Sequence, residues 1–359
     1  MNFNIVLILT IAITWFATWL VKKFAIHLNI LDYPNEPRKI HKKPTPLLGG
    51  LAIFLGFFIS VGIVLWLEPT WLNASLRLKN LIGLFVGGLI LMIGGALDDK
   101  YNLKPSRQMI FSVLAAFAVI ASGIGIREIT NPFGGVIDLA QWEKVLFWWQ
   151  GVGYRLTLPA DIFTFVWLLG MTYTTKFLDG LDGLVSGITV IGAMMIVLLT
   201  TMTKWFQPEV GLVAIIAAGA FLGFLIWNWH PAKIFLGTGG STFAGFLLGS
   251  LAIISGGKIA TTLLVLGVPI LDTAWVILRR LFWDKKSPTQ ADRKHLHFRL
   301  LDVGFSHRGA VLFLYIVAAL FGITTIFLQS REKLIALGSM AISMILLAIF
   351  LIRKSSYEK

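Results

Sequence analysis

Two pairs of closely spaced aspartates stand at the ends of long apolar runs. Asp98 and Asp99 are adjacent, and Asp179 and Asp182 lie three residues apart in "KFLDGLDGL". Adjacent carboxylates repel each other, which favours a bound cation or a raised pKa on one of them. Carboxylate oxygens in a chain without cysteine suit Mg²⁺ or Mn²⁺, which commonly share their ligands with substrate phosphates. The pairs therefore predict a divalent-metal site for phosphate chemistry.

Simpler interpretations of these aspartates stay open. Asp98 and Asp99 could end a solvated helix, although the helix dipole disfavours acids at that end. Asp179 and Asp182 would share one face of a helix, or Asp182 alone could cap the helix that follows it.

A glycine-rich stretch, "HPAKIFLGTGGSTF", places Gly237, Gly239 and Gly240 before an apolar run and Ser241 near the start of the expected helix. Backbone N–H groups at a helix N-terminus can hold an anion. A plain tight turn explains the glycines alone equally simply.

Two histidines stand in the basic stretch "DRKHLHFRL". His295 and His297 are two residues apart, a spacing that converges in an extended or turn segment but not on one helix face. Arg293, Lys294 and Arg299 surround them, so the stretch predicts anion binding rather than metal ligation. The alternative is a polybasic loop that lies on anionic lipid headgroups.

The elements that must position these residues are membrane helices. The chain of 359 residues is 57% hydrophobic and only 14% charged, with a mean hydropathy of +0.81. Repeated apolar runs of about twenty residues are long enough to cross a bilayer. We predict an all-α polytopic membrane protein with one domain over 1–359 and eleven spans, at 4–21, 48–67, 80–97, 108–126, 160–178, 184–202, 210–227, 242–256, 259–279, 311–329 and 334–352.

The basic residues predict the orientation of these spans. The net charge of +13 could suggest a nucleic-acid partner, but basic loops of a membrane protein usually report topology, so we expect none. Most Lys and Arg residues fall in the loops of one side, which predicts a cytoplasmic face there, an outer N-terminus and an inner C-terminus. All the polar stretches described above, and the first loop, fall on that face and form one composite site. The longest outer loop, 127–159, is expected to contain a short hairpin.

Six stretches follow one another over residues 30 to 310: "RKIHKKPTPLLGGLAIF", "GALDDKYNLKPSRQM", "FLDGLDGLVSGI", "NWHPAKIFLGTGGSTFAGF", "PILDTAWVILRRL" and "DRKHLHFRLLDVGFSHR". In this order, and on one side of the membrane, they resemble the polyprenyl-phosphate N-acetylhexosamine-1-phosphate transferases. The histidine stretch is similar to the branch that transfers GlcNAc-1-phosphate from UDP-N-acetylglucosamine to undecaprenyl phosphate. It is less similar to the branch that uses UDP-MurNAc-pentapeptide.

The resemblance implies that a polyprenyl phosphate attacks the β-phosphorus of a UDP-N-acetylhexosamine, releasing UMP and starting a lipid-linked cell-envelope glycan. It also implies a plasma-membrane location, Mg²⁺ or Mn²⁺ and a homodimer. It implies catalytic roles for Asp98, Asp99, Asp179 and Asp182, of which Asp98, Asp99 and Asp179 would ligate the metal. The implied substrate-binding residues are Lys43, Asn228, Lys233, Ser241, His295, His297 and Arg299. Phosphoryl transfer needs a cation and in-line positioning more than covalent chemistry, which agrees with these residues.

The chain departs from the family pattern at four positions. The family writes asparagines at the places of Tyr173 and Lys176, an aspartate metal ligand at Thr238 and a third histidine at Phe298. Threonine is a poorer Mg²⁺ ligand than aspartate, and an ammonium near the ion would repel it. We hypothesise that metal affinity is weakened, unless Lys176 snorkels to the interface and other residues supply ligands.

Three functions remain in competition at this point. The first is a sugar-phosphate transferase. The second is a degenerate relative that binds the lipid or nucleotide sugar without efficient turnover. The third is a transporter, but the acids gather on one face and no internal repeat is visible, unlike many transporters.

Overall fold

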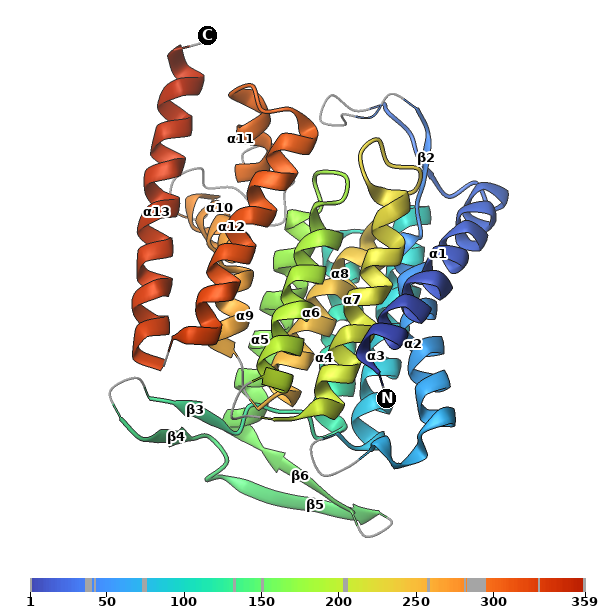
Figure 1. The fold of residues 1–359 in the computed structure, drawn as a ribbon, viewed down its shortest axis with the longest axis vertical. Helices are drawn as coiled ribbons and strands as arrows, with labels where there is room; N and C mark the ends of the chain where they lie inside the picture. Colours follow the sequence, from blue (N-terminus) through green and yellow to red (C-terminus); the bar gives the residue numbers. More distant parts are fainter. Residues whose placement is uncertain are drawn as a thin grey trace.

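The computed structural model describes residues 2–35, 41, 43–72, 76–131, 134–149, 152–202, 206–256, 259–280, 282, 295–328 and 330–357. These residues form a bundle of long helices with two strand hairpins at one end (Figure 1). The C-terminus lies at the end of the bundle that is far from these hairpins.

Every predicted span falls on a helix or on a pair of helices. The helices are α1 (Phe3–His27), α2 (Gly49–Leu67), α3 (Leu78–Tyr101), α4 (Pro105–Ala121), α5 (Leu158–Leu178), α6 (Leu184–Met202), α7 (Pro208–Asn228), α8 (Gly237–Ile254), α9 (Ile259–Val265), α10 (Gly267–Arg279), α11 (Leu296–Asp302), α12 (His307–Phe327) and α13 (Ser330–Tyr357). Among the described residues, seven helices are long and apolar enough to cross a membrane, or eight if the bent pair α9 and α10 is one span. The prediction of an all-α polytopic membrane protein is confirmed, whereas the count of eleven and the orientation stay predictions.

The ninth predicted span, 259–279, is bent rather than straight. Its two halves, α9 and α10, meet at an angle of 78°. Pro269 has no N–H to donate to the carbonyl of Val265 and cannot continue a helix from α9 without distortion. The bend redirects α10, which carries Asp272 toward the loop that precedes α11.

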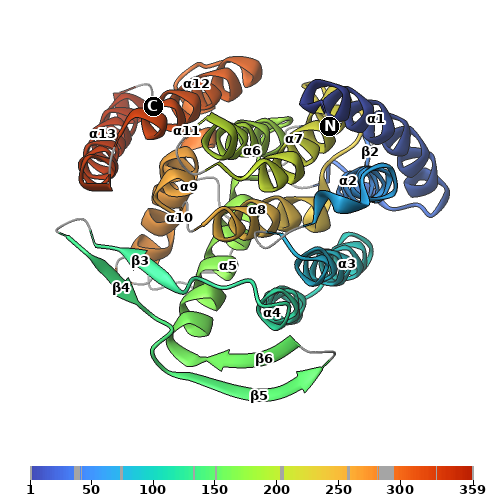
Figure 2. The ribbon, with the colours of Figure 1, turned by 60° about the horizontal axis from the view of Figure 1, so that its bottom comes forward.

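Helix α8 lies at the centre of the bundle and packs against α2, α3, α5 and α6 (Figure 2). Glycines make two of these contacts possible. A Cβ atom on Gly50 of α2 would lie 2.1 Å from the backbone of Gly240, and one on Gly95 of α3 would lie 2.2 Å from Gly239. Small residues allow membrane helices to approach this closely. The start of α8 is therefore fixed against the ends of α2 and α3.

Helix α8 begins five residues earlier than the predicted span over 242–256. The segment from Gly237 to Gly240, interpreted from sequence as a turn before the helix, forms its first turn. The reason is tertiary: this turn is enclosed by α2 and α3, and its first free N–H groups find a partner in a side chain of α3.

Four strands occupy the loop over 127–159, in which a hairpin was predicted. Strands β3 (Glu128–Thr130) and β4 (Val136–Asp138) pair antiparallel, as do β5 (Glu143–Trp149) and β6 (Val152–Thr157). A two-residue pair, β1 (Leu31–Asp32) with β2 (Thr45–Pro46), and a short 3₁₀ turn, Pro69–Trp71, complete the described elements. The connections that carry the predicted site lie at the opposite end of the bundle from β3–β6 (Figure 1).

Candidate active site

Asp98 is held at the end of α3 by donors from three segments. Its Oδ1 accepts hydrogen bonds from the backbone N–H of Leu103 at 2.9 Å and from Nε2 of Gln108 at 2.7 Å. Its Oδ2 accepts one from the hydroxyl of Thr238 at 2.6 Å. The left-handed conformation of Asn102 ends α3 and turns Leu103 back toward the carboxylate. Both oxygens of Asp98 are thus engaged by the protein.

The carboxylate of Asp99, a residue of α3, lies at the N-terminus of α8. The backbone N–H of Thr238 donates to Asp99 Oδ1 at 2.9 Å. A Cβ atom on Gly237 would lie 2.3 Å from Asp99 Oδ2, and Gly237 has a φ of +73°, so both space and backbone conformation favour glycine. The anion site predicted at this helix N-terminus therefore exists, but in this structure the anion is a side chain of the protein itself.

Lys176, in the last turn of α5, joins the same network. Its ammonium donates a hydrogen bond to Oε1 of Gln108, whose amide nitrogen in turn donates to Asp98. The ammonium also lies 5.8 Å from the centroid of the Tyr173 ring, within the range of a cation–π contact. Lys176 thus faces the carboxylate pair and does not snorkel away from it.

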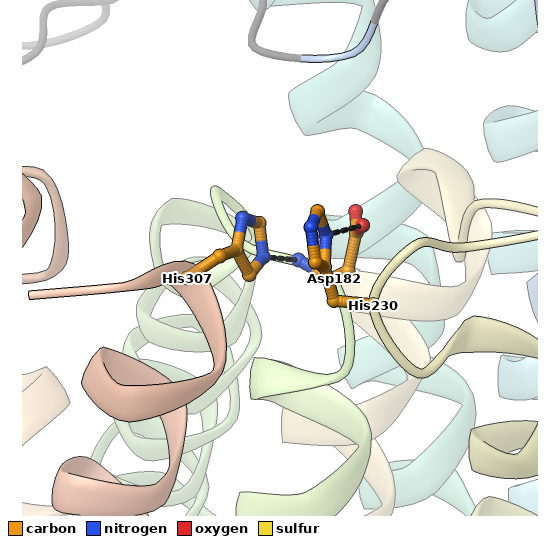
Figure 3. Close-up of side chains that lie close together, drawn as sticks. All are labelled: Asp182, His230 and His307. Carbon is orange, nitrogen blue, oxygen red and sulfur yellow. Dashed lines mark hydrogen bonds and ion pairs between the residues drawn. The ribbon is translucent and has the colours of Figure 1, made fainter.

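Asp182 ties three loops together (Figure 3). Its Oδ2 lies 2.6 Å from Nδ1 of His230 and accepts a hydrogen bond of 3.1 Å from the N–H of Ala232. Its own backbone N–H donates to Nε2 of His307 at 2.9 Å. The carboxylate of Asp182 therefore faces the α7–α8 connection, where it binds groups from outside its own loop.

Asp182, His230 and His307 are close enough to hold a metal ion, because one potential ligand atom from each lies within 4.8 Å of the others. The rings of His230 and His307 stack with centroids 3.9 Å apart and planes 13° apart. The lone pairs of two stacked, nearly parallel rings lie in two separate parallel planes, whereas the ligands of one ion must point at a common centre. We therefore interpret the group as a hydrogen-bonded clamp on Asp182.

Asp179 follows α5 directly and remains exposed on one side. Its partial loss of hydration and the charges of Asp99 and Asp182 raise its pKa, while the hydroxyl of Ser241 opposes that rise. Asp179 is therefore within electrostatic reach of Asp99, from the first pair, and of Asp182.

The segment that carries His295 and His297, the histidine loop, lies against the segment that carries Asp179 and Asp182, the aspartate loop. His295 Nδ1 lies 2.8 Å from Asp272 Oδ2, and the N–H of Leu296 donates to Asp272 Oδ1 at 2.9 Å. A Cβ atom on Gly180 would lie 2.1 Å from Nε2 of His297, so this glycine lets the loops touch. His295 is the residue before α11, and His297 lies in the first turn of α11. Their rings are stacked, with centroids 5.6 Å apart.

Burial determines the charge of His297. The side chain is 1% exposed, and loss of hydration lowers its pKa to about 3. His297 is therefore neutral near pH 7 and could contact a phosphate only as a hydrogen-bond donor, not as the cation that the sequence suggested.

The structure brings together most of the predicted site residues, but not all. The convergent ones are Asp98, Asp99, Asp179, Asp182, Ser241, His295 and His297. Asn228 is buried and engaged by Gly183, Ser186 and Ile234, which gives it a structural role in the loops. Lys43 is exposed, and Lys233 is exposed with its ammonium 5.5 Å from the ring of Trp227. Arg299 is half-buried in α11, whereas Arg293 and Lys294 lie outside the described residues.

Four residues of the site had no assigned role from sequence. They are Gln108, His230, Asp272 and His307. A signal existed for Asp272, because an acid inside an apolar run is costly and marks a functional candidate. Gln108 carried no such signal, since its role depends on the approach of α5 to α4.

Hydrogen-bond donors of the protein occupy part of the oxygen set at Asp98 and Asp99, where the resemblance implies a divalent ion. Mg²⁺ requires nearly octahedral coordination by oxygens. Of the four carboxylate oxygens, three accept hydrogen bonds from Leu103, Gln108 and Thr238. The fourth, Asp99 Oδ2, is buried without a hydrogen bond of good geometry among the described residues, beside the N–H of Leu48. Mg²⁺ or Mn²⁺ at this site stays a prediction that these contacts do not support.

Known proteins resemble this chain over most of its length. The glycosyl transferase family 4 model matches residues 81–256. A probable undecaprenyl-phosphate N-acetylglucosaminyl 1-phosphate transferase of Bacillus subtilis is 34% identical, over 91% of this chain and 84% of the relative. A decaprenyl-phosphate N-acetylglucosaminephosphotransferase of Mycolicibacterium smegmatis is 31% identical, over 95% and 87%.

A more distant relative agrees with these two. The undecaprenyl-phosphate alpha-N-acetylglucosaminyl 1-phosphate transferase of Escherichia coli K12 is 29% identical, over 83% of this chain and 76% of the relative. The chain therefore belongs to glycosyl transferase family 4, and it is similar to those members whose names describe N-acetylglucosamine-1-phosphate transfer to a polyprenyl phosphate.

Proposed function

We propose that this protein transfers GlcNAc-1-phosphate from UDP-GlcNAc to a polyprenyl phosphate. An oxygen of the lipid phosphate attacks the β-phosphorus of the nucleotide sugar, and the bond from that phosphorus to the bridging oxygen breaks. The products are UMP and a polyprenyl-diphosphate sugar that starts a lipid-linked glycan. The names of the relatives support the acceptor and the transferred group, since each describes an N-acetylglucosamine-phosphate transferase acting with a polyprenyl phosphate.

The observation that carries the proposal is an apolar cavity that reaches a carboxylate of the site. It has a volume of about 200 Å³ and is lined by Leu48, Gly50, Leu51, Leu89, Met92, Ile93, Ala96, Asp99, Leu236, Gly239 and Gly240. Leu89 and Ile93 are 39% and 50% exposed on the outer surface of α3, where a bilayer would cover them. A polyprenyl chain suits such walls, and its phosphate end would point toward the polar site that Asp99 borders.

Other polar groups of the site suit a nucleotide diphosphate. Lys176 supplies positive charge, and the imidazoles of His295 and His297 supply hydrogen-bond donors. Phosphoryl transfer depends mainly on positioning and on stabilising charge on the phosphate oxygens, so no covalent enzyme intermediate is needed. We further propose that this end of the bundle faces the cytoplasm at the plasma membrane, since the basic loops gather there.

A second candidate function is binding without efficient turnover. The carboxylate oxygens of Asp98 are already occupied by Gln108 and Thr238, which could leave a site that holds a lipid phosphate or nucleotide sugar but does not transfer.

The test is UMP release by the purified full-length chain. The chain is incubated with polyprenyl phosphate and a panel of UDP-N-acetylhexosamines, with Mg²⁺, Mn²⁺ or EDTA. Release of UMP with formation of a lipid-linked sugar, reduced by Asp98→Asn, supports the transferase. Asp138→Asn, on an exposed strand of the outer hairpin, is the matched control and should leave release unchanged. Binding of either substrate with no UMP under any condition would favour the second function.

A further inference from the structure

Three departures from the family pattern lie in one contact network. The ring of Tyr173 faces the ammonium of Lys176 at 5.8 Å, and Lys176 donates to Gln108. Gln108 and Thr238 then meet on the two oxygens of Asp98, at 2.7 and 2.6 Å. We interpret this network as a site whose positive charge comes from a lysine.

The charge of the network is consistent with that interpretation. Lys176 offsets negative charge of the Asp98 and Asp99 carboxylates, and Thr238 is neutral. A divalent ion placed here would meet a repelling ammonium, and both lone pairs of Asp98 Oδ1 already accept hydrogen bonds from Leu103 and Gln108.

The ammonium also retains unused donors. Of its three N–H groups, one donates to Gln108, and no other acceptor contacts the ammonium among the residues that the structure describes. A compact ammonium with free N–H groups is a general binding group for phosphate oxygens.

We propose that Lys176 is the resident cation of this site: its ammonium binds phosphate oxygens of the substrate in place of a divalent metal ion. The ligand is a phosphate or diphosphate anion, from either the polyprenyl phosphate or the nucleotide sugar. The inference rests on the proposed function for its choice of ligands.

Metal binding is the first measurement, because it does not depend on turnover. Mn²⁺ is titrated into the full-length protein and free Mn²⁺ is followed by electron paramagnetic resonance. The wild type and the control Lys104→Asn, an exposed lysine at the start of α4, should bind Mn²⁺ only weakly. The double variant Lys176→Asn with Thr238→Asp changes the local charge by two units and should bind Mn²⁺ about 100-fold more tightly.

Anion binding in EDTA is the second measurement, with UDP-GlcNAc and polyprenyl phosphate in separate arms. The wild type should bind without metal. Lys176→Asn should weaken binding about tenfold for whichever anion the ammonium contacts, while Lys176→Arg should retain most of it because the charge remains. Thermal unfolding of each variant establishes that it is folded.

The outcomes separate the two proposals. Stoichiometric Mn²⁺ binding by the wild type, with UMP release that EDTA abolishes, overturns the role of Lys176 and leaves the transfer reaction standing. Metal-independent anion binding that depends on Lys176, with no UMP under any condition, overturns the transfer reaction and leaves the role of Lys176 standing. Equal anion binding by the wild type and Lys176→Asn overturns the role of Lys176.

Discussion

The hydroxyl of Thr238 donates a hydrogen bond of 2.6 Å to Asp98 Oδ2, across 140 residues of sequence. This contact joins the first turn of α8 to the last turn of α3. The hydroxyl of Thr238 is neutral, and in this contact it acts as a donor to the Asp98 carboxylate. Thr238 therefore holds Asp98 in place by a direct hydrogen bond.

Thr238→Val tests this contact, because valine has nearly the same shape and lacks the hydroxyl. Loss of a hydrogen bond to a charged acceptor should cost about 1.5–3 kcal/mol of stability. It should also lower UMP release, since one oxygen of Asp98 loses its partner. Thermal unfolding in detergent and the transferase assay measure the two effects.

Thr324→Val is the matched control for this change. The hydroxyl of Thr324 donates to the carbonyl of Phe321 within its own helix, so the substitution should alter stability by less than about 0.5 kcal/mol. Equal losses in the two variants would contradict a special role for the contact of Thr238 with Asp98.

His307→Phe should loosen the loop that carries Asp182. Phenylalanine can still stack on His230, but it cannot accept the hydrogen bond from the N–H of Asp182. A buried N–H without a partner costs about 1–3 kcal/mol, and displacement of Asp182 should reduce transfer at least tenfold. Unfolding temperature and UMP release are measured together.

His307→Gln keeps an acceptor at this position and should recover part of the loss, while His27→Phe on the exposed end of α1 should show no loss. Identical behaviour of the phenylalanine and glutamine variants would show that the hydrogen bond is not the cause.

Gly180→Ala should force the aspartate loop and the histidine loop apart. The added Cβ would lie 2.1 Å from Nε2 of His297, whose ring is buried and cannot move freely. Overpacking of this kind costs about 1–3 kcal/mol, and we expect lower stability with weaker nucleotide binding. Gly170→Ala in α5, where a Cβ meets nothing within 4 Å, should be neutral or stabilising by up to about 1 kcal/mol. A stable and fully active Gly180→Ala protein would exclude this contact as a determinant of the site.

Stability should fall as pH drops below the ordinary histidine pKa, because of His297. Burial lowers the pKa of His297 to about 3, so the native side chain stays neutral while the unfolded one binds a proton below about 6.5. The contribution of His297 is fully present above about pH 6.5 and is lost toward pH 3, at up to about 1.4 kcal/mol per pH unit. Unfolding temperatures from pH 7.5 to 5 should show a smaller decline for His297→Phe than for the wild type. Parallel curves would refute the assignment.

The sequence by itself determined the membrane helices and most of the reactive groups. Apolar runs of membrane length set the positions of the spans, because only helices satisfy their own backbone hydrogen bonds in lipid. The costly placement of Asp98, Asp99, Asp179 and Asp182 beside those runs predicted a site, and the structure brings these four residues to one end of the bundle.

Other features followed from contacts between segments that are distant in sequence. The early start of α8 depends on the glycines of α2 and α3 that pack against it. The bend between α9 and α10 combines the local effect of Pro269 with the packing of α13 on Gly267. No local pattern encodes those neighbours, so a straight span and a loose glycine turn were the natural predictions.

The charge state of the site was decided only by the tertiary structure. The sequence showed that Lys176 and Thr238 depart from the family pattern, but their effect depends on which groups they reach. The fold places Lys176 on Gln108 and Thr238 on Asp98, and it buries His297 until it is neutral. Electrostatic and hydrogen-bond energies depend on distance and hydration, and both are set by packing between helices rather than by the order of residues.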